Sequence, residues 1–338
     1  MPSFNIENLK SLQNLGLLEE SIEEIICDYI YNNCYIRDLI FDYHEYSEYI
    51  TEKIKSKNNT NKNIGIELEL NSLDQIEILE LAIDGSICVN DETYGVEKLC
   101  NVFASYDGSL NNMGAEFVTE PAEPQTALLA IENVLYNLSW SDSINCGLHF
   151  HLDSNLDGDS WFKDLNHLKT FICLFSRWYK FFSKITGRGW ESLDEWARNP
   201  FEDGDEIAEY FQDFGYDEFE SWTTHNMAID LRDNTVEVRI FDSSEYYNQI
   251  CEKWELLQYF IGYTAELDEE TVMKILTDKN YSNSELYMFA LSIPVMIQKV
   301  SYSHKIEKKS ICTMHLKVFE KMEDRITPYI FLDSEEVL

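Results

Sequence analysis

Gly65-Ile-Glu-Leu-Glu-Leu70 carries the clearest structural pattern in the sequence. Apolar and acidic residues alternate along it. Because successive side chains of a β-strand point to opposite faces, Glu67 and Glu69 share the face opposite the apolar residues. Such a strand packs one face on a hydrophobic core and holds two carboxylates on the other. We therefore predict a β-strand whose polar face carries negative charge that other groups must neutralise.

Three further stretches repeat this alternation, and each carries ionisable residues at its polar positions. The solvated face of an ordinary sheet is polar, but carboxylates gathered on one face repel each other unless cations lie among them. The pattern predicts a sheet face that binds divalent cations and an anionic ligand. The stretches are Ala115-Glu-Phe-Val-Thr-Glu120, Gly147-Leu-His-Phe-His-Leu152 and Thr235-Val-Glu-Val-Arg-Ile240, with Glu116, Glu120, His149, His151, Glu237 and Arg239 at the polar positions.

Each pattern by itself also has an ordinary structural interpretation. A Glu-x-Glu pair is more often a solvated strand face, and a strand histidine is as often a hydrogen-bonded structural residue as a metal ligand. Glu237 and Arg239 fit a simple ion pair, and Asp107-Gly-Ser109 is first of all a turn signature. The combination and order of these patterns make the functional interpretation specific.

The rest of the sequence predicts helices around these strands. Strands separated by long helices are typical of an α+β fold with a mainly antiparallel sheet. Residues 201–220 carry nine acids and no base, which indicates a solvated helix or loop, with a lid as the alternative. Helices are expected over residues 5–55, Gln125–Leu138 and Trp161–Ile185 and from residue 245 onward, and further strands over Ser86–Asn90 and Asn226–Leu231.

The composition narrows the classes of partner. Sixty-two acids against 26 bases give a net charge of −36, which repels nucleic acid and anionic membranes. An anionic ligand would therefore need bound cations and a few well-placed arginines. The eight cysteines form no Cys-x-x-Cys pair, and no run of about eighteen apolar residues or secretory signal is present. We expect a cytoplasmic protein with reduced core thiols.

Six motifs, in this order, resemble the amidoligase family of the glutamine synthetase and glutamate–cysteine ligase superfamily. The similarity covers roughly residues 62 to 260, whereas residues 1–60 and the C-terminal helices show no family pattern. The motifs are Gly65-Ile-Glu-Leu-Glu69, Asp107-Gly-Ser-Leu110, Gly114-Ala-Glu-Phe-Val-Thr-Glu-Pro121, Cys146-Gly-Leu-His-Phe-His151, His225-Asn-Met-Ala-Ile229 and Val236-Glu-Val-Arg-Ile-Phe241.

The resemblance implies a fold and a reaction. The fold is a curved, mainly antiparallel sheet with helices on its outer face, which would occupy residues 62–245 between a helical region at 1–60 and another at 246–338. The concave face would hold ATP and two or three Mg²⁺ or Mn²⁺ ions. The enzyme would phosphorylate a carboxylate to an acyl phosphate, which an amine then attacks. The substrates would be a small-molecule or peptide carboxylate and an amine.

The resemblance also implies roles for single residues, carried over at matching motif positions. Arg239 would hold the transferred phosphoryl group, and His151 would contact nucleotide or substrate. Glu120 fits its position less well because Pro121 ends the strand beside it. Independently of the family, Arg188 in Thr186-Gly-Arg-Gly-Trp190 is a candidate phosphate or carboxylate contact, with pairing to nearby acids as the alternative. The implied metal ligands are Glu67, Glu69, Glu116, His149 and Glu237, of which Glu67 would also be catalytic.

Two other functions remain open at this point. His149-Phe-His-Leu-Asp153 also fits a zinc hydrolase, with His225 as the third imidazole of the region, although the number of carboxylates favours Mg²⁺ or Mn²⁺. The second alternative is a catalytically inactive binding protein on the same fold, with residues 201–220 and the helical ends as its interaction surface.

Overall fold

The computed structural model describes most of the middle of the chain. The described residues are 36, 40–41, 62–89, 101–139, 141–156, 160–186, 188, 190–201, 204–213, 226–232 and 235–297. The helices expected over residues 5–55 and the second half of the acidic segment 201–220 therefore lie largely outside them. Among the described helices, none is long and apolar enough to cross a membrane.

The described strands form one six-stranded sheet in the order β2-β3-β1-β4-β6-β5. The pairs β1–β3, β2–β3 and β5–β6 are antiparallel, which confirms a mixed fold with a mainly antiparallel sheet. The strands are β1 (Ile64–Leu70), β2 (Val102–Ser105), β3 (Ala115–Thr119), β4 (Gly147–Asp153), β5 (Ile229–Arg232) and β6 (Thr235–Asp242).

The described helices separate and follow these strands. They are α4 (Gln75–Asp84), α6 (Pro124–Asn137), α7 (Leu165–Arg177), α8 (Tyr179–Ile185), α9 (Trp190–Trp196), α10 (Gly204–Asp213), α12 (Tyr247–Thr264), α13 (Glu269–Thr277) and α14 (Lys279–Ile297). The chain divides into two compact units, and strand β4 begins in the first and continues in the second. Of the described residues, the first unit holds 36, 40–41, 63–148 and 243–245, and the second holds 62, 149–242 and those from 246 onward.

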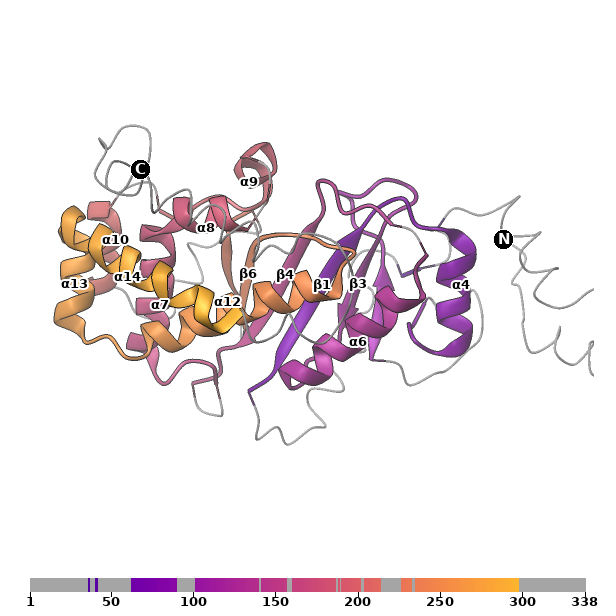
Figure 1. The fold of residues 1–338 in the computed structure, drawn as a ribbon, viewed down its shortest axis with the longest axis horizontal. Coiled ribbons are helices and arrows are strands. Elements are labelled where there is room, and N and C mark those ends of the chain that lie inside the picture. Colours follow the sequence, from indigo (N-terminus) through magenta and orange to yellow (C-terminus); the bar gives the residue numbers. More distant parts are fainter. Residues whose placement is uncertain are drawn as a thin grey trace, which may run out of the picture. The chain divides into compact units, whose positions relative to one another are not determined.

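In the first unit, α6 packs against β1 and β3 (Figure 1). The apolar residues of β1 are fully buried, as the alternation predicts, and Leu68 lies opposite Phe117 of β3. Helix α6 begins with Pro124, whose fixed backbone angle suits the first helical turn, and buries Ile131 and Val134. Gly114 precedes β3 where a Cβ would lie 2.5 Å from Asn71 Oδ1 and 2.8 Å from Leu110 Cβ, so a larger residue would force its neighbours to shift.

In the second unit, helices α7, α8, α12 and α14 share an aromatic core. Phe260 of α12 is fully buried at its centre. Its ring centroid lies 4.8 Å from that of Phe182, 5.3 Å from that of Phe171 and 5.4 Å from that of Phe289. Edge-to-face and tilted ring pairs at these distances add to the hydrophobic burial. This core holds the helices that follow the last strand.

The structure corrects three expectations about local structure. Strand β2 was not predicted. Of the strand expected over Ser86–Asn90, the described residues 86–89 form a single parallel bridge, between Cys88 and Phe103. The helix expected over Trp161–Ile185 is two helices, because Trp178 leaves helical geometry between α7 and α8. These features depend on non-local pairing and on packing, which apolar periodicity over a short window does not register.

The cysteines also differ in part from the expectation of reduced thiols. Cys146, Cys173 and Cys251 are free, and burial raises the pKa of the Cys173 thiol well above its usual range. Cys88, however, is disulfide-bonded. The expectation rested on the absence of a Cys-x-x-Cys pair and of a secretory signal, and neither observation excludes a disulfide at another spacing.

His167 joins α7 to the end of α12 in a geometry that suits only the neutral imidazole. Its Nδ1 accepts a hydrogen bond from the Lys163 N–H at 3.0 Å, and its Nε2 lies 3.0 Å from the Ile261 carbonyl oxygen. Nε2 therefore carries the proton. Burial lowers the pKa of His167, because desolvation disfavours the charged form.

The first prediction follows from this lowered pKa. The unfolded chain takes up a proton at His167 below about pH 6.5, while the folded protein resists it, so stability falls as the pH drops through that value. We expect His167→Gln to lower the free energy of unfolding by about 1–3 kcal/mol near pH 7.5, because the substitution removes the hydrogen bonds of the imidazole. The penalty should shrink by about pH 5.5. Urea unfolding of wild type and variant at the two pH values measures this penalty. A difference in stability that stays the same at both pH values would contradict the prediction.

Candidate functional site

Three glutamates lie on neighbouring strands of the first unit. Glu69 of β1 lies directly opposite Glu116 of β3, and the two are 5% and 3% exposed. Glu67 is half-buried two residues before Glu69, on the same face. The carboxylate of Glu69 accepts a hydrogen bond from the Gly147 N–H. The polar face of these strands is thus a cluster of carboxylates shielded from water.

In the second unit, Glu237 of β6 lies among cationic and imidazole groups. Its side chain is 1% exposed. His149 Nδ1 lies 3.4 Å from Glu237 Oε1, and His151 Nε2 lies 4.0 Å from the same oxygen. Arg239 Nη1 donates to this oxygen as well. The alternation of β4 and β6 therefore brings two histidines, one glutamate and one arginine onto a common face, as predicted.

Sequence reasoning missed two residues of β5, Asp230 and Arg232. Asp230 lies directly opposite Glu237, and Arg232 donates to Asp230 Oδ2 at 3.0 Å and to Glu237 Oε2 at 3.3 Å. A signal for them was present, because both alternate with the apolar Ile229 and Leu231. The strand expected over Asn226–Leu231 contains Asp230 but ends one residue before Arg232, with which β5 ends.

The two predicted arginines differ in what they contact. Arg239 is 5% exposed, and its Nε approaches the Trp196 carbonyl oxygen at 3.5 Å. Arg188 is also buried, and it donates from Nη1 to the Arg239 carbonyl oxygen at 2.5 Å and from Nε to Ser192 Oγ at 2.9 Å. Arg188 thus supports the backbone of β6, whereas the guanidinium of Arg239 lies on the polar face beside Glu237.

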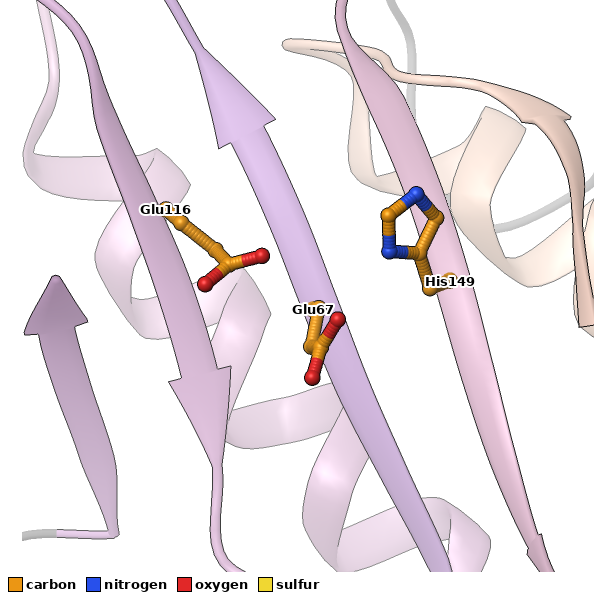
Figure 2. Close-up of side chains that lie close together, drawn as sticks. All are labelled: Glu67, Glu116 and His149. Carbon is orange, nitrogen blue, oxygen red and sulfur yellow. The ribbon is translucent and has the colours of Figure 1, made fainter. Parts of the chain in front are cut away.

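Two sets of three side chains have ligand atoms within 4.8 Å of one another. One consists of Glu67, Glu116 and His149, and the other of Glu67, His151 and Glu237. Figure 2 shows the first set, whose members come from β1, β3 and β4. Five of the predicted site residues are thereby brought together, and Arg239 adjoins them through Glu237. Among the described residues, neither set includes Glu69.

The remaining candidates lie elsewhere. Asp107 Oδ1 accepts from the Ser109 N–H at 2.7 Å, which is the turn geometry expected of Asp107-Gly-Ser109. Glu120 follows the end of β3, and its N–H donates to the Asn101 carbonyl. Burial raises the pKa of Asp153 at the end of β4. His225 lies outside the described residues.

No protein-family model matches the sequence, and neither does any curated protein sequence. Among solved structures, the complex between the prokaryotic ubiquitin-like protein Pup and its ligase PafA matches at 12% sequence identity and a TM-score of 0.33. The match covers 80% of this chain and 65% of the other, so this chain spans less than two thirds of the matched one. At that TM-score the likeness carries no argument about activity.

Proposed function

We propose that this protein is an ATP-dependent carboxylate–amine ligase that works with divalent cations. The observation that carries the proposal is the burial of ionisable side chains at the polar positions of the strands. Glu116, His149 and Glu237 are each at most 3% exposed. Burying carboxylates is unfavourable unless cationic groups or metal ions compensate them. A sheet face that keeps them buried is therefore suited to a function that needs concentrated negative charge.

The donor set fits hard divalent cations. Carboxylate oxygens with one imidazole suit Mg²⁺ or Mn²⁺, whereas a zinc site ordinarily has three protein ligands rich in nitrogen or sulfur. Glu67, Glu116 and His149 would hold one ion, and Glu67, His151 and Glu237 a second. When bound, the ions would offset the negative charge of the nucleotide phosphates. ATP and a substrate carboxylate, both anions, could then approach an acidic protein.

The side chains of this protein have defined tasks in the proposed reaction. A carboxylate oxygen attacks the terminal phosphorus of ATP, and the bond from that phosphorus to the ADP oxygen breaks. Arg239 would hold the phosphoryl oxygens, on which charge is spread in the transition state. The amine then attacks the acyl carbon, loses a proton, and phosphate departs with the electrons of the carbon–oxygen bond. The substrates would be a small-molecule or peptide carboxylate and an amine.

The zinc-hydrolase alternative is less well supported by the geometry. It requires His149, His151 and Asp153 to act together. Within the part of the chain that the structure describes, each candidate set contains a single histidine with two glutamates, and Asp153 belongs to neither. Metal analysis after purification separates the two functions, because a hydrolase of this type would retain zinc.

The second prediction tests metal dependence of nucleotide binding. The acidic face should repel a nucleotide when it holds no cation and attract it once cations are bound. We expect a non-hydrolysable ATP analogue to bind at least about 10-fold more tightly with Mg²⁺ or Mn²⁺, as expected for ligand coupling of ordinary strength. Isothermal titration calorimetry measures both affinities. Equal affinity in excess chelator would rule out the assigned metal sites.

A further inference from the structure

The hairpin of β5 and β6 places two carboxylates directly opposite each other. Asp230 and Glu237 are register partners, so their side chains project from the same face. Both are buried, at 5% and 1% exposed. Like charges in directly opposed positions destabilise a strand pair. Something must therefore compensate this pair when no metal ion is bound.

Arg232 bridges the two carboxylates from the surface. Its Nε lies 3.0 Å from Asp230 Oδ2, and its Nη2 lies 3.3 Å from Glu237 Oε2. The Arg232 side chain is nevertheless 45% exposed, against 6% for Arg239. The other Glu237 oxygen is contacted by Arg239 and His149. The two oxygens of Glu237 thus meet different cations, one buried and one partly in solvent.

Arg232 is much more exposed to solvent than Arg239. Arg239 is enclosed by the protein, its Nε approaches the Trp196 carbonyl, and its own carbonyl accepts from Arg188. The guanidinium of Arg232 could turn outward by rotating its long side chain, without moving the strand. A guanidinium released in this way presents a planar fork that matches phosphate oxygens.

We propose that Arg232 is a displaceable counter-ion that couples cation binding at Glu237 to binding of an anionic nucleotide. The inference rests on the proposed function and adds a residue to that site. Without metal, Arg232 compensates Asp230 and Glu237. A divalent cation takes over this compensation, because it and Arg232 compete for the same carboxylate. Arg232 then turns to the phosphate groups of the nucleotide, and each ligand strengthens binding of the other by the same factor.

The third prediction concerns Arg232→Gln and uses two titrations. Mg²⁺ titrated into the nucleotide-free protein should bind about 10-fold more tightly than in wild type, because its competitor is gone. ADP titrated at saturating Mg²⁺ should bind about 10-fold more weakly, because a phosphate contact is lost. Isothermal titration calorimetry gives both constants. Arg198→Gln removes an equal charge from an exposed position of the same unit and should change neither.

A second variant separates this role from simple support of the hairpin. Asp230→Asn breaks the Arg232–Asp230 ion pair but keeps the arginine, so ADP affinity at saturating Mg²⁺ should stay near the wild-type value. Equal losses of ADP affinity in Arg232→Gln and Asp230→Asn would overturn the proposal. An Arg232→Gln protein with wild-type constants would overturn it as well, while leaving the ligase function in place. If wild type itself binds ADP equally with and without Mg²⁺, the ligase proposal fails instead.

Discussion

Arg239→Lys is expected to lower the rate of ADP formation by on the order of 10²-fold or more, because arginines that stabilise phosphoryl transfer contribute ~10³–10⁵. The lysine keeps a positive charge beside the buried Glu237 carboxylate, so the ion pair survives in part. It loses the planar fork, which now reaches both Glu237 and the Trp196 carbonyl. The rate is measured by screening mixtures of carboxylates and amines for ADP release.

Stability separates this catalytic role from a structural ion pair. Loss of a structural pair should lower the melting temperature while the protein that remains folded stays nearly as active. In the catalytic case the melting temperature should stay within about 4 °C of wild type, while the rate of ADP formation falls by on the order of 10²-fold or more. Arg198→Lys provides the matched control at an exposed position. An Arg239→Lys protein that stays fully active with any substrate pair would show that the acyl-phosphate mechanism is wrong.

Glu116→Gln is expected to have opposite effects with and without metal. Glu116 lies opposite Glu69, and its ligand atom is within 4.8 Å of that of Glu67. Glutamine keeps the shape and removes one of these buried charges. The metal-free protein should therefore become more stable, by up to about 1 kcal/mol. Binding of Mg²⁺ or Mn²⁺ should weaken by at least about 10- to 100-fold, the range seen even for groups that only support metal ligands.

Thermal unfolding with and without Mn²⁺ tests the expected gain in stability of the metal-free protein, and calorimetric titration tests the expected loss of metal affinity. Glu80→Gln is the matched control, because Glu80 is exposed on α4 of the same unit. If Glu116 serves only as a buried hydrogen-bonding residue, glutamine should destabilise the protein to the same extent in both conditions and leave the metal affinity unchanged. That outcome would remove Glu116 from the proposed site.

Much of the candidate site could be predicted from local patterns, because the two-residue period of a strand is a local property. The five strands expected around Glu67, Glu116, His149, Asp230 and Glu237 are present, and the apolar alternate positions are buried. Strand β2 escaped prediction because its four residues, Val-Phe-Ala-Ser, do not alternate and are all buried. The three-part division of the chain, the family assignment and the substrates stay predictions.

Which residues share the polar face follows from the order of residues along each strand, since covalent geometry sends alternate side chains of any strand to the same side. Which of these residues contact one another depends on how the strands pair. Hydrogen bonding between strands sets the register that places Glu69 opposite Glu116 and Asp230 opposite Glu237. The same non-local contacts direct Arg188 to the backbone of Arg239 and bring Arg232 to Glu237. Register and long-range pairing depend on the whole sheet, so no single strand encodes them.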